Sequence, residues 1–372
     1  MIAQSPSEPP IGKRASVYII LVNWNGCADT IECLESLVRL EDDDFSVVIV
    51  DNGSSDQSAE RIRDWSIAPA ATMPRSPIWS RLPKARRIAA DVRVVALADD
   101  PAPIPDGSRI TMIMAGANLG FAAANNIGMA FADRDPDTAY FWILNNDTVV
   151  EPASLSMLRT YARSDPQRGL IGAVAFYYHD PDVVQGVAGW FNPARAEGGH
   201  IGHMCSRDTL PSTETIRSKI AYVMGVSMFV ARPVYDYVGG MCEDYFLYYE
   251  ELDWAARIAG RFGQDVCREA RLYHKEGAAI GTSTVRRSSD TALYYMAVNL
   301  LRFMKKHHSR YLAAAYRRLV RLLVRYVQRR SLGAFRATML AIIDVALGRW
   351  RNGKYGSPEF KAYRSAPPGV RE

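Results

Sequence analysis

Apolar and polar residues alternate in blocks along the first 60 residues, in a pattern that predicts a strand, a helix and a second strand. The β-branched runs at 17–22 and 47–50 each end in polar residues, and the segment between them, 30–40, has apolar residues at helical spacing. Two strands joined by a crossover helix favour a parallel sheet. In such sheets, ligands bind at the carboxyl ends of the strands.

The same blocks continue through the rest of the chain. Further strands are predicted at 109–114, 140–144, 170–176 and 222–231, and helices at 116–132, 152–161, 250–261 and from 290 onward. Segment 65–107 has no clear periodicity and is predicted to be a surface insertion, while the Gly-rich segment 186–202 is predicted to form loops over the crevice. We therefore expect a flexible N-terminus (1–16), an α/β domain (17–285) and a helical C-terminal region (286–372).

Polar side chains that follow the predicted strands are the first candidates for a site. Asn23 and Asn25 follow the first strand, Asp51 follows the second, and Asn145-Asn146-Asp147 follows the strand at 140–144. Their oxygens are of the kind that holds Mg²⁺ or Mn²⁺. A polar triplet after a strand is also an ordinary turn, so the motif by itself leaves both interpretations open.

Three acids, Glu250, Glu251 and Asp253, lie at the start of the predicted helix 250–261, next to an aromatic stretch. Acids in a first helical turn interact favourably with the helix dipole. Acids beside aromatic rings also suit a general base with a raised pKa. His274 follows another short apolar run and is a candidate imidazole ligand, although a lone histidine is more often structural.

Composition and charge narrow the class of protein. The chain is 48% hydrophobic and 23% charged, which is typical of a globular protein, and its five scattered cysteines suggest a reducing, cytoplasmic compartment. No apolar run near the N-terminus has the length of a signal peptide or a membrane span. Segment 291–343 holds eleven Lys and Arg and no acid, whereas the remainder has 34 basic and 40 acidic residues.

The helix at 316–329 carries most of this positive charge. Five arginines share one side of it, and the opposite side is apolar: Arg317, Arg318, Arg321, Arg325 and Arg329 against Leu319, Val320, Leu323, Val324 and Val327. One interpretation is a solvated face on a helix that packs its apolar side on the core. The other is docking on an anionic membrane leaflet. Nucleic acid is not expected as a partner, because no recognition motif accompanies the charge.

Five segments in order resemble the hallmark motifs of family 2 glycosyltransferases with the GT-A fold, and most closely its rhamnosyltransferase-like branch. These segments are Val22-Asn23-Trp24-Asn25, Val50-Asp51-Asn52-Gly53-Ser54-Ser55-Asp56, Asn118-Leu119-Gly120-Phe121-Ala122 with Asn125-Asn126, Leu144-Asn145-Asn146-Asp147-Thr148, and Phe246 to Trp254. The resemblance implies a mixed α/β sheet of the GT-A, Rossmann-like nucleotide-diphospho-sugar transferase type, flanked by helices, with a basic α-helical C-terminal extension.

The resemblance also implies a role for each matching residue. Donor nucleotide and sugar contacts fall on Val22, Asn23, Asn25, Asp51, Asn118, Gly120, Phe121, Asn125 and Asn146, with Asp51 at the nucleobase. The metal ligands fall on Asn145, Asp147 and His274, the catalytic base on Glu251, and supporting acids on Glu250 and Asp253. Asn145 stands where the family usually has Asp, and Glu251 where it often has Asp.

The expected function is that of an inverting, Mg²⁺- or Mn²⁺-dependent transferase that moves L-rhamnose from dTDP-rhamnose to a lipid-linked or growing polysaccharide. Alternatives are a UDP-sugar transferase of the same fold, for galactofuranose or a hexose, and a non-catalytic membrane-associated scaffold. The expected partners are a dTDP- or UDP-sugar, a glycan acceptor and an anionic membrane surface. The expected location is the cytoplasmic face of the plasma membrane.

Overall fold

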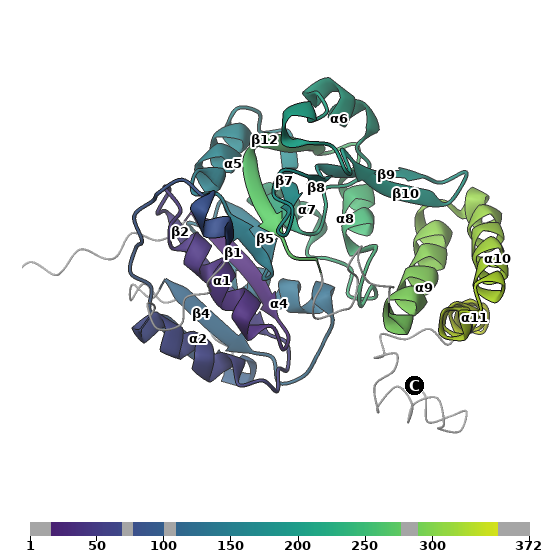
Figure 1. Cartoon of the computed structure of the whole chain (residues 1–372), viewed down its shortest axis with the longest axis horizontal. Helices are drawn as coiled ribbons and strands as arrows, with labels where there is room; N and C mark the ends of the chain where they lie inside the picture. Colours follow the sequence, from purple (N-terminus) through teal and green to yellow (C-terminus); the bar gives the residue numbers. More distant parts are fainter. Residues whose placement is uncertain (1–15, 69–76, 100–108, 277–288, 349–372) are drawn as a thin grey trace, which may run out of the picture.

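The computed structural model describes residues 16–68, 77–99, 109–276 and 289–348. A mixed β-sheet lies between two layers of helices, and a separate group of helices follows it (Figure 1). The strands are β1 (Val17–Asn23), β2 (Phe45–Asp51), β3 (Val92–Ala96), β4 (Ile110–Met114), β5 (Tyr140–Asn145), β6 (Thr148–Val150), β7 (Arg168–Tyr177), β8 (Val184–Gly186), β9 (Ala188–Asn192), β10 (Glu197–Ile201), β11 (Ser227–Ala231) and β12 (Gly263–His274). The α-helices are α1 (Cys27–Leu37), α2 (Ser58–Ile67), α4 (Phe121–Asp133), α5 (Ser154–Arg163), α6 (Thr213–Lys219), α7 (Arg232–Val238), α8 (Glu250–Ile258), α9 (Asp290–His307), α10 (Leu312–Gln328) and α11 (Leu332–Ala346).

The order of the strands determines where the site can form. In the main sheet the order is β3-β4-β2-β1-β5-β11-β7-β12-β6, and the first five strands are parallel. β11 runs antiparallel to both β5 and β7. The carboxyl ends of β1, β2 and β5 therefore lie side by side, as the sequence pattern predicts.

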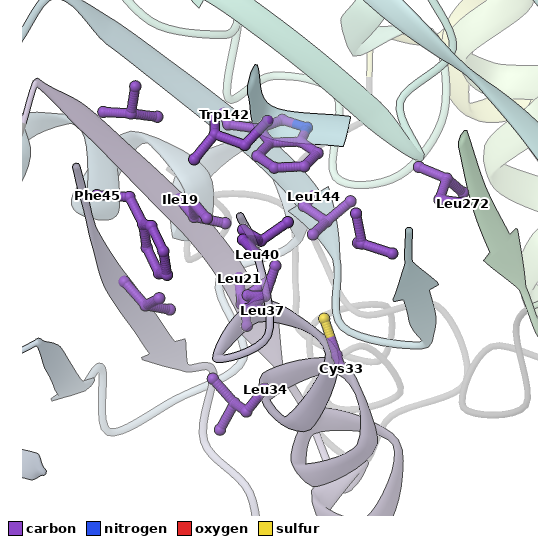
Figure 2. Packing of buried hydrophobic residues seen from close by; sticks show 14 of the residues in the cluster. Ile19, Leu21, Cys33, Leu34, Leu37, Leu40, Phe45, Trp142, Leu144 and Leu272 are labelled. Atoms are coloured by element: carbon purple, nitrogen blue, oxygen red, sulfur yellow. The ribbon is translucent and has the colours of Figure 1, made fainter. Parts of the chain in front are cut away.

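Apolar side chains cover both faces of the sheet. On one face, α1, α2 and α5 supply one apolar core, and Figure 2 shows Leu37 of α1 next to Leu21 of β1. On the other face, α4, α7 and α8 supply a second core. Because both faces are buried, the parallel strands are apolar along their length and polar only where they end.

Segment 65–107 is more than a surface insertion. Trp65 is fully buried, and its indole Nε1 donates to Glu35 at 3.0 Å, so it belongs to the core around α1. β3 pairs with β4 and extends the sheet at its edge. Residues 69–76 and 100–108 of this segment lie outside the described residues, as do 1–15 of the predicted flexible N-terminus and the predicted boundary at 285.

The Gly-rich segment 186–202 also differs from the prediction, because it forms an antiparallel hairpin, β9–β10, rather than loops. Gly189 allows this hairpin to lie against Tyr222, since a Cβ at Gly189 would be 1.9 Å from Tyr222 Cζ. A sequence pattern dominated by glycine conceals such a strand pair, because the glycines contribute no side-chain alternation.

The C-terminal helical extension is present and consists of α9, α10 and α11, which share an apolar core (Figure 1). Among the described helices, none has both the length and the apolar character needed to cross a membrane.

The apolar side of α10 is only partly used in this core. Leu319 and Leu323 are buried, but Val320, Val324 and Val327 are 55%, 51% and 62% exposed. The sequence pattern places all five on one side opposite the arginines, yet in the structure three of them share the solvent-facing surface with arginine side chains. The packing of α9 and α11 therefore covers a narrower strip of α10 than its amphipathic pattern suggests.

Candidate functional site

The ends of β1 and β2 are joined by buried polar side chains. Asn23 is fully buried; its Nδ2 donates to Asp51 Oδ2 at 2.8 Å and to Ser54 Oγ at 3.0 Å. The other carboxylate oxygen of Asp51 accepts from the Ser54 backbone N–H at 2.9 Å. Both oxygens of this 1% exposed carboxylate thus hold the turn after β2. A direct contact between Asp51 and a nucleobase stays a prediction.

The other predicted residues of β1 lie around this junction. Val22 is partly buried against the core on the α4 side of the sheet. Asn25 is exposed, has a left-handed backbone (φ 52°), and accepts a hydrogen bond from the Ser55 backbone N–H at 2.7 Å. A left-handed asparagine is tolerated because its short polar side chain bonds locally, so Asn25 shapes the rim of the junction.

A second loop, 118–121, is fastened to the same junction. Asn52 Nδ2 donates to Asn118 Oδ1 at 3.1 Å, and the Leu119 N–H donates to Asn52 Oδ1 at 2.8 Å. Gly120 has φ 89°, and a Cβ there would be 2.6 Å from the ring of Phe246. The Phe121 N–H donates to Phe246 O at 3.0 Å, so this loop joins the strand ends to the segment before α8.

Asn125, on α4, has an unmet hydrogen-bonding capacity. The residue is 1% exposed, and its Nδ2 donates to Phe121 O at 2.9 Å. Its Oδ1 is buried and has no hydrogen-bond partner among the described residues. An unsatisfied buried acceptor is costly, which makes it a candidate ligand contact.

The end of β5 brings the three predicted metal ligands together. His274 Nε2 lies 3.1 Å from Asp147 Oδ1 and 3.3 Å from Asn145 Nδ2. Asn146 turns to the other side, where its Nδ2 donates to Thr30 Oγ1 at 2.8 Å, and Thr30 in turn donates to Asn23. The strand-end junction and the β5 triplet are therefore joined by one hydrogen-bond network that passes through buried Thr30.

Two residues that the sequence did not single out orient His274. Gln185, on β8, accepts from His274 Nδ1 through Oε1 at 2.9 Å, while its Nε2 donates to Glu276 Oε1 at 2.9 Å. Because Glu276 fixes which end of the Gln185 amide faces the ring, Gln185 holds the Nδ1 side of His274, and Nε2 faces Asp147. No local signal in the sequence reveals this, since Gln185 is 89 residues from His274.

The residues at the end of β5 fit a divalent cation. One carboxylate, one imidazole and one amide oxygen form a donor set that Mn²⁺ and Mg²⁺ accept, and two ligands of one such ion lie about 3 Å apart. For Asn145 this requires the amide to turn its oxygen to the place where its Nδ2 now faces His274. Within the described part of the chain, no three His, Cys, Asp or Glu side chains gather closely enough to hold a metal, so Asn145 would have to supply the third protein ligand. Burial lowers the pKa of His274, but the neighbouring Asp147 overcomes this and raises it overall.

The pKa values of the acid pair at the start of α8 are strongly raised. Glu250 is buried and Glu251 is half-buried, and Oε2 of each has no hydrogen-bond partner among the described residues. Burial raises the pKa of Glu251 to about 7. Burial and the neighbouring Glu251 raise the pKa of Glu250 well above its ordinary range. A base with a pKa near neutrality is suited to take a proton in general base catalysis.

Asp253 lies in the same helical turn but has a different environment. Its carboxylate is fully buried and contacts Arg257, Lys306 and His307 at 2.9, 2.7 and 2.7 Å. Although burial acts in the opposite direction, hydrogen bonds from His307 and Lys306 lower the pKa of Asp253 to about 2. Asp253 therefore stays ionised and connects α8 to α9.

Polar side chains gathered at the carboxyl ends of parallel strands, with a histidine held by Gln185 beside them, are typical of α/β proteins that bind ligands at this edge of the sheet. Residues 18–87 and 93–205 match the model of glycosyl transferase family 2. The chain is thus a family 2 glycosyltransferase. A search of the curated proteins finds no match to it.

Solved structures resemble the whole fold at low sequence identity. GalNAc-T7 with UDP, GalNAc and Mn²⁺ has a TM-score of 0.51 at 12% identity, over 78% of this chain and 48% of that chain. The mannosyltransferase PcManGT from Pyrobaculum calidifontis, in complex with GDP-Man and Mn²⁺, has a TM-score of 0.47 at 15% identity, over 96% and 81%. TarS 1–349 from S. aureus has a TM-score of 0.45 at 11% identity, over 81% and 70%. This chain has the GT-A fold, and it spans about half the length of the GalNAc-T7 chain.

Proposed function

We propose that the chain transfers a sugar from a nucleotide diphosphate to a hydroxyl group of a glycan acceptor, with inversion, and that Glu251 is the base. The acid pair carries this proposal. Glu251 has a pKa near neutrality and an unpartnered carboxylate oxygen. The loop 118–121, which is fastened to the strand ends where a nucleotide would bind, is hydrogen-bonded to Phe246, five residues before Glu251.

The reaction needs one displacement step. Glu251 takes the proton of the acceptor hydroxyl as its oxygen attacks the anomeric carbon from the face opposite the diphosphate. The bond from that carbon to the diphosphate oxygen breaks, and its electron pair stays on the phosphate. No covalent sugar intermediate is needed, because the acceptor itself is the nucleophile.

Asn145, Asp147 and His274 would hold a divalent cation beside the departing diphosphate. When bound, Mg²⁺ or Mn²⁺ supplies positive charge that offsets the charge developing on the leaving group. Other residues of the chain orient these ligands. Gln185 bonds His274, and Thr30 bonds Asn146 in the turn between Asn145 and Asp147.

For the donor we propose a deoxyhexose on dTDP, with L-rhamnose as the first choice, and UDP-sugars as the alternative. Support comes from the motif resemblance. Purified full-length protein with Mn²⁺ and a glycan acceptor is offered dTDP-rhamnose, UDP-galactofuranose and UDP-hexoses, and nucleotide release is measured. Release with dTDP-rhamnose and its loss in Glu251→Gln are expected. Absence of release with every donor would refute the transferase proposal for this chain.

We also propose that the acceptor is reached at a membrane surface on the cytoplasmic side. α10 presents Val320, Val324 and Val327 to solvent beside exposed arginines, and a shallow hollow there is lined by Tyr316, Arg317, Val320 and Arg321. Valines among arginines fit the boundary between anionic headgroups and acyl chains. Each cation near such a surface contributes about 1 kcal/mol.

Co-sedimentation with vesicles of phosphatidylglycerol and phosphatidylcholine tests this surface. Replacing Arg317, Arg321 and Arg325 with Gln should weaken binding by about 100-fold, since about 1 kcal/mol is lost for each of the three charges. The matched control replaces Arg61, Arg63 and Arg163, which are exposed elsewhere and change the net charge equally. Equal effects of both triple variants, or binding that does not weaken at high salt, would contradict docking through α10.

A further inference from the structure

The segment that leads into the acid pair is held by a buried amide from the C-terminal helices. Asn299, on α9, is 1% exposed, and its Nδ2 donates to Leu247 O at 2.8 Å and to Tyr248 O at 3.0 Å. These two carbonyls lie two and three residues before Glu250. Figure 1 shows α9 beside α8, at the boundary between the helical extension and the sheet domain.

The backbone next to these carbonyls is strained. Tyr248 and Tyr249 have φ values of 69° and 74°, so two bulky residues in succession occupy the left-handed region. Such a conformation costs free energy for a side chain with a Cβ, and it persists only where the surroundings enforce it. Tyr249 is also the residue that caps α8, and its carbonyl accepts from the Asp253 N–H at 2.9 Å.

Aromatic side chains of α9 also contact this turn, but these contacts do not by themselves determine the orientation of its peptide groups. The ring of Phe246 stacks on Tyr295 with centroids 4.9 Å apart, and the ring of Tyr249 lies 5.7 Å from that of Phe303. Ring contacts tolerate rotation of the backbone between them, whereas hydrogen bonds to two successive carbonyls do not.

The amide of Asn299 is oriented at a cost. Its Oδ1 is buried and has no hydrogen-bond partner among the described residues. A buried acceptor without a partner destabilises the fold. The side chain thus leaves its oxygen unsatisfied while its Nδ2 group bonds the two carbonyls of the strained turn. This indicates that the hydrogen bonds from Nδ2 determine its orientation.

We propose that Asn299 is a positioning residue for the transfer reaction, and that α9 through it sets the direction in which the acid pair points. This inference rests on the proposed function, in which Glu251 is the base. It gives α9 a role in the transfer reaction, in addition to the membrane contact proposed for α10.

Full-length Asn299→Leu tests the proposal, because leucine keeps the volume of the side chain and removes both donors. We expect kcat for nucleotide release to fall at least tenfold while the KM for the nucleotide sugar changes less than threefold. The predicted donor contacts at Asn118 and Asn125 make no hydrogen bond to Asn299, so donor binding should persist. The matched control is Tyr294→Phe, which removes another buried hydrogen bond of α9, at 2.8 Å, whose partner is Asp344 on α11 and not the segment before α8.

The control separates positioning from general loosening of the helices. A fall in kcat that is equal in Asn299→Leu and Tyr294→Phe, or a kcat of Asn299→Leu within twofold of wild type, would overturn the proposal. If Asn299→Leu does not fold, Asn299→Ser replaces it, because serine keeps one hydroxyl donor. Its kcat should fall by less than that expected for Asn299→Leu, and a kcat equal to that of wild type would also overturn the proposal. Wild-type protein that releases no nucleotide refutes the proposed function, and this inference with it.

Discussion

Replacing Glu251 with Gln should make the protein more stable in alkaline solution while it abolishes transfer. Burial raises the pKa of Glu251 from its ordinary value of 4.5 to about 7. The folded state therefore binds the proton more tightly than the unfolded state does. The contribution of the protonated Glu251 side chain to stability is fully present below pH 4.5. It is lost as the pH rises through 7, because the buried carboxyl group must then ionise. Glutamine does not ionise, so the variant avoids this loss.

The magnitude follows from the shift in pKa. A rise from 4.5 to about 7, at about 1.4 kcal/mol per pH unit, amounts to about 3 kcal/mol. Glu251 is partly exposed and shares its environment with Glu250, so water relieves part of this cost. We expect Glu251→Gln to raise the free energy of unfolding by about 1 to 2 kcal/mol at pH 8 and by almost nothing at pH 4.5.

Urea denaturation of both proteins at pH 4.5 and pH 8 measures this difference. Glu214→Gln is the matched control, because Glu214 also lies in the first turn of a helix, α6, but is exposed. It should leave stability unchanged or slightly reduced at both pH values. A Glu251→Gln variant that is no more stable than wild type at pH 8 would show that the carboxylate is solvated or paired, and would remove the physical basis for a neutral-pH base.

Four further outcomes are expected. In wild type, kcat should increase about tenfold per pH unit below pH 7 and level off above it, measured as nucleotide release, since Glu251 must be ionised to act. Asp253→Asn should lower the free energy of unfolding by about 2 kcal/mol at pH 7 but not near pH 2, as measured by urea denaturation. The reason is that the Asp253 carboxylate contributes stability above pH 3.8, and this contribution is lost as the pH falls toward 2. Gly120→Ala should cost about 2 kcal/mol or more in the same assay, since its Cβ would meet Phe246 at 2.6 Å. Gln185→Leu should weaken Mn²⁺ binding about 10- to 100-fold by titration calorimetry, because His274 loses the acceptor that orients it.

The sequence predicted the strand-end residues well because period and polarity act locally. A buried parallel strand must be apolar until it ends, so Asn23, Asp51 and Asn145 mark three adjacent strand ends before any tertiary contact is known. The position of the acid pair in a first helical turn, beside aromatic residues, likewise made it a candidate site from local sequence alone. Only the family resemblance distinguished Glu251 from Asp253; the local pattern could not, since their environments differ through Lys306 and His307, more than 50 residues from Asp253.

By itself, then, the sequence determined the alternation of elements, the parallel half of the sheet and the edge where polar groups collect. Only the tertiary structure decided which side chains turn His274, which amide holds the turn before the acid pair, and which valines of α10 remain in solvent. The physical reason is that periodicity states which faces of an element are apolar, but not which neighbour covers them. Asn299 and Gln185 acquire their roles from strand order and helix packing, which join parts of the chain that no local pattern connects.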